Sequence, residues 1–359
     1  MSILKILVFE YITGGGFNKH ELPDSLANEG SLMLNALLDN LRSHVGIEIT
    51  VMLDWRLHAI ARDGVYAENL PGAVAAPVNM KSINTVIINA EHDISEEFAR
   101  LILQSDAVWP VAPEFDGILQ ALCQSVESLG KILLTSPASA VAIAGNKFKT
   151  FELLSQHQIA TVPTRMLEGD YSPGEWMVKP VDGVGCADSY VIGNRQDFEQ
   201  ISMRKGNDCM NAGAIAEYVI QPHLQGKKTS LSCLFKQGSG WLVCANLQRF
   251  EFINQQYHLT EIVVNHHADS GAYQQLVDQI AHAFPELWGY VGIDLIETAE
   301  QMLVLEINPR LTTSFVGIHA ALGINPAEAV LQLVNGKPVL DPSKNLSITI
   351  KVKQETNAS

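Results

Sequence analysis

Apolar residues in the first third of the chain fall into short continuous runs that polar stretches separate. The runs cover residues 3–10, 47–53, 85–89, 107–111 and 131–135. Continuous runs of this length are typical of strands buried on both faces of a sheet. Between the first two runs, apolar residues recur three to five positions apart over residues 29–43, which predicts a helix. The alternation predicts a mostly parallel, doubly wound α/β domain at residues 1–135.

The pattern changes after residue 136. A helix is indicated at residues 147–157, and frequent strands separated by glycine-rich turns are indicated from residue 176 onward. These strands are expected at residues 176–180, 188–192, 214–220, 229–236 and 241–248. A helix at 272–284, paired strands at 289–297 and 302–307, and closing helices at 314–322 and 326–334 follow. This predicts a β-rich α+β arrangement with a small lobe at residues 136–220 and a large lobe at residues 221–359.

The bulk composition disfavours several classes of protein. A chain of 359 residues exceeds one ordinary core, so two or three compact units are expected. The 24 Lys and Arg residues against 39 Asp and Glu residues give a net charge of −15, which argues against a nucleic-acid partner or an anionic membrane surface. Five scattered cysteines without a CxxC pair indicate reduced thiols and a cytoplasmic protein. No apolar run reaches the length of a membrane helix, and the first run is interpreted as a strand rather than a signal peptide.

The most informative chemical signal is a group of oxygen-bearing side chains near the C-terminal end. Glu306 and Asn308 lie two positions apart on one predicted strand, so their side chains leave the same face. Asp294 stands at the end of a neighbouring strand, and three such oxygen ligands suit Mg²⁺ when a polyphosphate supplies the others. Arg310, after the strand-ending Pro309, could stabilise charge on a transferring phosphoryl group. The alternative is a hairpin that carries surface carboxylates.

Two lysines and a glycine-rich turn form a second signal. Lys179 ends a short strand, and a turn that contains Asp182, Gly183 and Gly185 follows it. Backbone N–H groups in such a turn can approach phosphate oxygens, and a lysine at the end of the strand can reach the same oxygens. The turn is not a Walker A loop, because that motif is absent. Lys147 heads the predicted helix at 147–157, and by itself it would be interpreted as a solvated lysine of the first turn.

One strand leaves two interpretations open. Glu217, Tyr218 and Val219 lie on a strand that leads into a connection between the lobes. Backbone groups there can read the edge of an adenine ring, and an acidic side chain can accept a hydrogen bond from its amino group. The five residues around this position fit an ordinary edge strand equally well.

The N-terminal domain offers two further candidates. Gly14, Gly15 and Gly16 follow the first strand, where doubly wound sheets bind ligands, so they form either part of a substrate pocket or a tight turn. A dinucleotide fingerprint is not met, because position 19 is lysine. Glu114 follows Pro113 and is interpreted mainly as a partner of the dipole in the first turn of a helix, with a place in the pocket as the alternative.

The combined set of residues resembles the ATP-grasp superfamily in order and spacing. The matching positions are Lys147, Lys179 with its glycine turn, Glu217 to Val219, Asp294, Glu306, Asn308 and Arg310. Glu-Ile-Asn-Pro-Arg at 306–310 is the most specific element, and the resemblance covers about residues 110–335. It implies an α+β ATP-grasp fold, in which two lobes clasp ATP, behind an N-terminal companion domain.

The resemblance also implies the roles of these residues. The two lysines and the glycine turn would bind the phosphates of ATP, and the strand at 217–219 would bind adenine. Asp294, Glu306 and Asn308 would hold two Mg²⁺ ions, which Mn²⁺ could replace. Arg310 and Lys179 would act in catalysis, in which a carboxylate attacks the γ-phosphate and an amine then attacks the acyl phosphate.

This sequence departs from the family pattern in two places. Many relatives carry glutamate where Asp294 stands, although aspartate occurs there in the D-alanine ligase branch. Relatives often place an acidic residue for the ribose just after the adenine strand, but residues 225–230 read Gln-Gly-Lys-Lys-Thr-Ser. The sequence therefore does not assign the contact to the ribose.

Two short motifs point to a narrower branch. The Glu-Tyr-x-x-Gly-Gly-Gly start at 10–16 and Lys-Pro-Val-Asp-Gly-Val-Gly-Cys at 179–186 are similar to the tyramine–glutamate ligases of methanofuran biosynthesis. This implies glutamate as the carboxylate, tyramine as the amine and a γ-glutamyl amide as the product. Thr312, Thr313 and Ser314 would face the substrate carboxylate. An ATP-binding regulatory protein and an ATP-grasp carboxylase or kinase are the alternatives, and a homodimer is left open.

Overall fold

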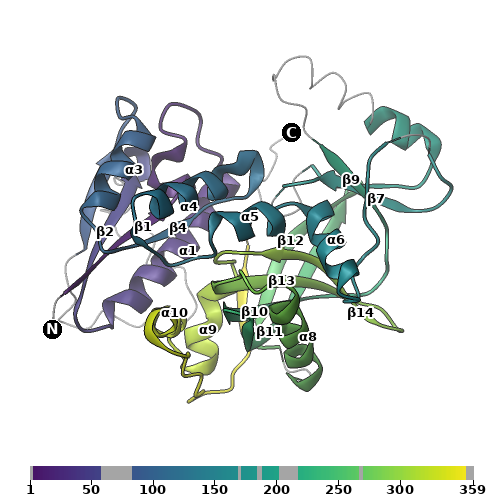
Figure 1. Cartoon of the computed structure of the whole chain (residues 1–359). Helices are drawn as coiled ribbons and strands as arrows, with labels where there is room; N and C mark the ends of the chain where they lie inside the picture. The colour runs from purple at the N-terminus through teal and green to yellow at the C-terminus, as the bar shows by residue number, and fades with distance from the viewer. Residues whose placement is uncertain are drawn as a thin grey trace.

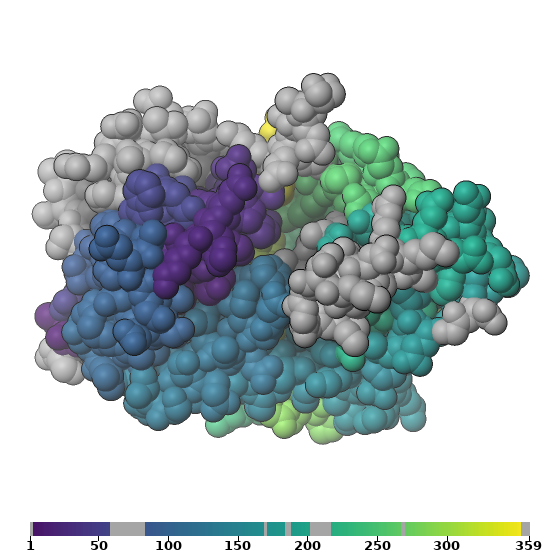
Figure 2. Space-filling model, turned by 90° about the horizontal axis from the view of Figure 1, so that it is seen from above, coloured from purple at the N-terminus to yellow at the C-terminus, as the bar shows by residue number. Residues whose placement is uncertain are grey.

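Three sheets organise the molecule, and each comes from a different region of the chain. The computed structural model describes residues 3–57, 83–168, 171–183, 188–201, 217–266 and 270–352. The six-stranded sheet lies between the five-stranded N-terminal sheet and the smaller four-stranded sheet (Figure 1). Seen from above, the N-terminal domain, in purple and blue, and the four-stranded sheet, in teal, lie at opposite ends (Figure 2).

The N-terminal sheet is entirely parallel, in the order β3-β2-β1-β4-β5, which confirms the predicted doubly wound domain. Its strands are β1 (Leu4–Glu10), β2 (Ile47–Asp54), β3 (Asn84–Ile88), β4 (Ala107–Val111) and β5 (Ile132–Leu133). Its helices are α1 (Asp24–Arg42), α3 (Ile94–Leu103) and α4 (Ile118–Ser128). On β1, Ile6 and Val8 face α1, whereas Leu7 and Phe9 face α3 and α4. Because both faces are covered, the strand is a continuous apolar run.

The six-stranded sheet is antiparallel, and three helices of the middle of the chain cover one of its faces. Its order is β14-β13-β10-β11-β12-β15. The strands are β10 (Lys227–Lys236), β11 (Ser239–Ile253), β12 (Gln256–Val264), β13 (Gly289–Glu297), β14 (Met302–Asn308) and β15 (Ile348–Lys351), and the helices are α5 (Ala138–Ala144), α6 (Lys147–Gln156) and α8 (Ser270–Ala283). Val291, Ile293 and Leu295 pack with these helices, so Gly292 and Asp294 point to the opposite face.

The four-stranded sheet forms the small lobe and is linked to the large sheet by a hairpin. Its order is β6-β9-β7-β8, with β6 (Arg165–Met166), β7 (Trp176–Pro180), β8 (Tyr190–Ile192) and β9 (Tyr218–Pro222). The turn between β11 and β12, at Asn254 and Gln255, has positive φ angles of 52° and 64°. At its tip, the N–H of Val191 donates to the carbonyl of Gln255 over 2.8 Å.

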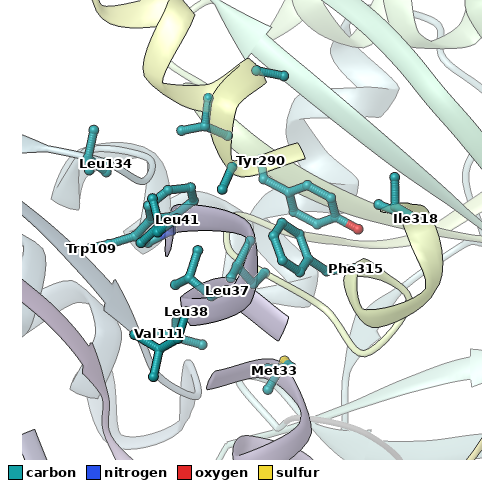
Figure 3. Close-up of a cluster of buried hydrophobic side chains, with 14 of the residues drawn as sticks. Met33, Leu37, Leu38, Leu41, Trp109, Val111, Leu134, Tyr290, Phe315 and Ile318 are labelled. Atoms are coloured by element: carbon teal, nitrogen blue, oxygen red, sulfur yellow. The ribbon is translucent and has the colours of Figure 1, made fainter. Parts of the chain in front are cut away.

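Helix α1 joins the N-terminal domain to the large lobe. It packs between the parallel sheet and the C-terminal helices α9 (Phe315–Leu322) and α10 (Pro326–Asn335). Leu37 and Leu41 of α1 meet Trp109 from β4 and Phe315 from α9 in one buried cluster, which we call the joint core (Figure 3). Because no solvent layer separates these side chains, the two regions share one hydrophobic core.

The structure corrects several element boundaries. The helix expected near Pro113 begins at Ile118, because a 3₁₀ turn with positive φ at Asp116 and Gly117 precedes it. Helices α3 and α5 and strands β12 and β15 were not predicted, whereas the predicted pair at 289–297 and 302–307 matches β13 and β14 within one residue. None of the helices in the described part of the chain has the length and apolar character needed to span a bilayer.

The joint core predicts a large penalty for truncation at Leu37, which is fully buried. Leu37→Ala should lower the free energy of unfolding by about 2–5 kcal/mol, because it leaves a cavity between the two regions. Leu103→Ala is the matched control, since Leu103 is 61% exposed, and it should change stability by less than about 0.5 kcal/mol. Urea unfolding of both variants measures the difference, and equal losses would contradict a shared core.

Candidate active site

A cavity lies between the six-stranded sheet and the small lobe. The metal-ligand candidates Asp294, Glu306 and Asn308 line it together with Lys179 and Arg310. The sequence placed these residues up to 131 positions apart, and the two sheets bring them to one space. We call this space the central cavity.

The two carboxylates face each other across a strand pair. Asp294 on β13 is the register partner of Glu306 on β14. The register shifts between Asp294 and Leu295, which leaves Leu305 as an extra residue on β14. Neighbouring strand residues normally point to opposite faces, but the bulge lets both Leu305 and Glu306 line the central cavity.

Hydrogen bonds orient Asp294 within this pair. Gln248 donates through Nε2 to Oδ1 of Asp294 over 3.0 Å, and Asn308 donates through Nδ2 to Oδ2 over 3.2 Å. Burial, together with the neighbouring charge of Glu306, raises the pKa of Asp294. Burial also acts to raise the pKa of Glu306, but the charges of Lys147 and Lys179 outweigh it and lower that pKa. The site therefore favours protonation of Asp294 and ionisation of Glu306.

This donor set fits a divalent cation with oxygen ligands. Two facing carboxylates and the amide oxygen of Asn308 are hard donors of the kind Mg²⁺ prefers. Among the described residues, no group of three His, Cys, Asp or Glu side chains could hold a metal alone. A metal between Asp294 and Glu306 would thus need the amide of Asn308 and oxygens from a ligand.

The two lysines approach the carboxylates from different elements. Lys147, at the start of α6, lies 3.5 Å from Oε2 of Glu306 and donates to the carbonyl of Gly183 over 2.6 Å. Its side chain is buried, so the interpretation as a solvated first-turn lysine is wrong. Lys179 on β7 lines the central cavity. Lys179 therefore contributes positive charge to the cavity wall, and Lys147 contributes it through its contact with Glu306.

The glycine-rich turn connects the small lobe to the N-terminal domain. Asp182 accepts a hydrogen bond from the backbone N–H of Asp116 over 3.1 Å, and Gly183 contacts Lys147. Gly185, the third residue predicted in this turn, lies outside the described residues. The turn thus contacts Lys147, which itself lies beside Glu306 of the cavity wall.

The residues predicted to bind adenine, 217–219, are not among those that line the central cavity. Tyr218 and Val219 are buried, and β9 pairs with β7 on one side and β6 on the other. The carbonyl of Glu217 accepts from Val181 N–H over 2.9 Å. The residues of this segment that line the central cavity lie further along the chain, at 221–224.

Arg310 is held by a carboxylate from the N-terminal domain. Its Nε and Nη2 donate to Oε1 and Oε2 of Glu114 over 2.9 and 2.8 Å. Burial acts to lower the pKa of Arg310, but Glu114 outweighs it and raises that pKa. Glu114 precedes a 3₁₀ turn rather than heading a helix, so its main interpretation as a first-turn dipole partner is wrong. No local pattern in the sequence indicates a pair 196 positions apart.

The three hydroxyl residues after Arg310 are hydrogen-bonded from behind the cavity. Thr312 and Ser314 join the hydroxyl of Tyr290 at 3.2 Å each, and Thr313 donates to the carboxylate of Glu29. All three line the central cavity. Burial raises the pKa of Tyr290 to about 12, so this network stays protonated.

The N-terminal glycines form a turn that holds a buried carboxylate. Gly14, Gly15 and Gly16 end a single turn of five residues, in which Gly15 has a φ of 100°. Thr13 of the turn donates from N–H and Oγ1 to Oε2 of Glu10 over 2.7 and 2.6 Å. Burial raises the pKa of Glu10 to about 7. The glycines are not among the residues that line the central cavity.

The sequence analysis did not predict that Phe250 and Tyr257 line the central cavity. Lys228 lies over the rings of Phe250 and Tyr257, at 4.5 and 2.9 Å from their centroids. The hydroxyl of Tyr257 meets Nε2 of His223 over 2.9 Å, and Nδ1 of that histidine lies 3.0 Å from Glu175. The sequence analysis predicted a strand within β11 but none at β12. The hairpin between them, and its contact with the small lobe, were therefore not expected.

The facing carboxylates predict that Asp294→Asn stabilises the metal-free protein. A carboxyl group whose pKa is raised on folding stabilises the protein at low pH. This stability is lost as the pH rises above the pKa of the unfolded carboxyl group, which is about 4. The melting temperature in EDTA at pH 7.5 should therefore rise by about 2–4 °C, and the gain should shrink toward pH 5. Asp341→Asn, at an exposed position, is the control. A lower melting temperature for Asp294→Asn would contradict the charge conflict.

Comparison with known proteins agrees with this geometry. Residues 47–141 match the pre ATP-grasp 3 domain, and residues 144–314 match the ATP-grasp domain. The chain is 24% identical to a tyramine–L-glutamate ligase of Methanocaldococcus jannaschii over 357 residues, which cover 99% of this chain and 94% of that protein. A ligase of the same name from Methanocaldococcus fervens is 22% identical, and the match covers 97% of both chains.

Solved structures share the fold along nearly the whole chain. A crystal structure of an ATP-grasp superfamily protein from Archaeoglobus fulgidus superposes with a TM-score of 0.67 at 20% identity, covering 97% of this chain and 92% of that one. An L-amino acid ligase from Bacillus licheniformis superposes with a TM-score of 0.64 at 15% identity, covering 95% and 79%. The two matched domains, the ligase relatives and the shared fold together identify this chain as an ATP-grasp ligase with a pre-ATP-grasp domain.

Proposed function

We propose that this ligase uses ATP to join the γ-carboxylate of glutamate to a primary amine such as tyramine. The observation that carries the proposal is that Lys179 and Arg310 line one cavity with Asp294 and Glu306. Lys147 lies 3.5 Å from Glu306 and adds a further positive charge next to the cavity wall. Cations there suit a triphosphate and a carboxylate, and the paired carboxylates suit Mg²⁺. The tyramine–L-glutamate ligase relatives, matched over nearly the whole chain, support the choice of substrates.

The nucleotide would lie with its adenine in the apolar part of the cavity. Met177, Ile296 and Leu305 line this part, and the residues at 221–224 border it. The phosphates would then extend toward Lys179 and Lys147. In this orientation Glu306 would lie beside the terminal phosphates, where its negative charge suits metal-bound rather than free oxygens.

The reaction would proceed in two steps. A carboxylate oxygen of glutamate attacks the γ-phosphorus, the bond to the β-phosphate oxygen breaks, and ADP leaves with that electron pair. The amine nitrogen then attacks the acyl carbon, phosphate departs, and the nitrogen loses a proton. When bound, Mg²⁺ neutralises charge on the phosphates, while Lys179 and Arg310 supply fixed positive charge to the group in transfer.

The first experiment follows ADP release and amide formation together. Purified protein with Mg²⁺, ATP and glutamate is assayed with and without tyramine, and the product is identified by mass. Glu306→Ala should lower turnover by at least about 100-fold, whereas Glu300→Ala, at an exposed turn, should leave it within about twofold.

Other outcomes separate the alternatives. ADP release without consumption of an amine would favour a carboxylase or kinase on the same frame. Tight ATP binding without turnover for any carboxylate and amine would instead indicate a regulatory protein. Either result would sink the proposed amide synthesis.

A second prediction concerns the buried lysine of α6. Lys147→Met should weaken ATP binding by about 10–100-fold, because it removes a charged donor from the phosphate side of the cavity. Lys149→Met is the matched control, since Lys149 lies two positions along the same helix and is exposed. Calorimetric titration with ATP and Mg²⁺ measures both, and equal affinities would remove Lys147 from the nucleotide site.

A further inference from the structure

The segment around Arg310 is held by side chains of the N-terminal domain. The hydroxyl of Thr135 donates to the carbonyl of Pro309 over 3.0 Å. Glu114 pairs with the guanidinium of Arg310 over 2.8 and 2.9 Å. At the next turn of the chain, Thr313 donates to Glu29 of α1. Three contacts thus tie this segment of the large lobe to another domain.

The Glu114–Arg310 pair is buried, and the absence of a side chain at Gly145 leaves space for Glu114. The side chains of Arg310 and Glu114 are only 12% and 5% exposed. Glu114 packs against Gly145, where an added Cβ would lie 3.1 Å from its Cβ and Cγ. A buried ion pair seldom stabilises a fold more than apolar residues of the same volume would. Stability alone therefore does not account for the pair.

The geometry leaves part of the guanidinium available for a ligand. Of the five N–H groups of an arginine, the described residues accept from three: two go to Glu114 and one to the carbonyl of Leu311. Arg310 lines the same cavity as Glu306 and Asn308. Because Glu114 grips one edge of the planar group, it sets the direction in which the remaining N–H groups point.

We propose that Glu114 is a positioning residue that aims Arg310 at the phosphoryl group in transfer. The pre-ATP-grasp domain thereby takes part in the chemistry through one side chain, although among the described residues its only contribution to the wall of the central cavity is Glu29. The inference rests on the proposed function, in which Arg310 stabilises the charge of the transferring group.

Kinetics of a double-mutant cycle test this role. Glu114→Gln keeps the shape of the side chain but removes its charge, and it should lower kcat by about 10–100-fold while KM for ATP stays within about twofold. Arg310→Lys should lower kcat at least as much, because lysine cannot form the two-point contact. The double variant should be no slower than Arg310→Lys alone by more than about threefold.

A second ion pair of the same domain, with a buried carboxylate and a partly exposed arginine, provides the control. Asp54 and Arg56 are joined through Nε and Nη2 over 2.8 and 2.7 Å, away from the central cavity. Asp54→Asn should lower the melting temperature without lowering kcat. This separates a loss of stability from a loss of the orientation of Arg310. A kcat for Glu114→Gln within twofold of wild type would overturn the proposal, as would losses that multiply in the double variant.

A probe independent of the substrates separates this inference from the proposed function. Mg²⁺ and ADP with aluminium fluoride mimic the phosphoryl group in transfer. The extra rise in melting temperature that aluminium fluoride adds to ADP should shrink equally in Glu114→Gln and Arg310→Lys, with the rise from ADP alone unchanged. If wild type makes no amide from glutamate and tyramine, the proposed substrates fail, and this comparison decides the role of Glu114. An undiminished rise in Glu114→Gln would reject it.

Discussion

The shared core between helix α1 and the C-terminal helices is the constraint on which the rest of the structure depends. Leu37 and Leu41 pack against Phe315 without an intervening solvent layer, so the parallel sheet and the large antiparallel sheet keep one fixed relation. Buried apolar contacts of this extent resemble a domain interior more than a domain interface. That fixed relation is what lets Glu114 and Thr135 reach the segment that carries Arg310. The geometry of the candidate active site therefore depends on packing far from it.

Within the large sheet, strand alternation divides structural from chemical residues. Val291, Ile293 and Leu295 fill the core under α8, whereas Asp294 points to the other face of the sheet and lines the cavity. This arrangement forces Asp294 against Glu306 in register, at a cost in charge repulsion and desolvation. Binding sites tolerate repulsion between neighbouring carboxylates when a bound cation removes that repulsion. The bulge at Leu305 then adds an apolar side chain to the same face, beside the carboxylates.

Sequence reasoning found what local pattern encodes. The β13–β14 pair and the shared location of Asp294, Glu306 and Asn308 on it followed from strand periodicity and a specific motif, and the parallel domain followed from alternating runs. It missed features that arise from register or from contacts distant in sequence. No local signal marks a one-residue slip at Leu305, nor a carboxylate 196 positions from its arginine. Strands β12 and β15 were also missed, although the β-branched residues at 262–264 and 348–350 favour strands.

The hairpin between β11 and β12 has a consequence for how the molecule moves. At its tip, the large sheet meets β8 through one backbone hydrogen bond from Val191 to Gln255, with a further link from Tyr257 to His223. The N-terminal domain and large sheet share the joint core, whereas the small lobe is held by these contacts and by the hydrogen bonds of Asp182 and Gly183, polar links that cost comparatively little to break. The small lobe would thus be the part able to swing, with the hairpin contact as one latch. Entry and exit of the nucleotide would then be timed by the release of that latch, on the microsecond-to-millisecond scale of hinged closures.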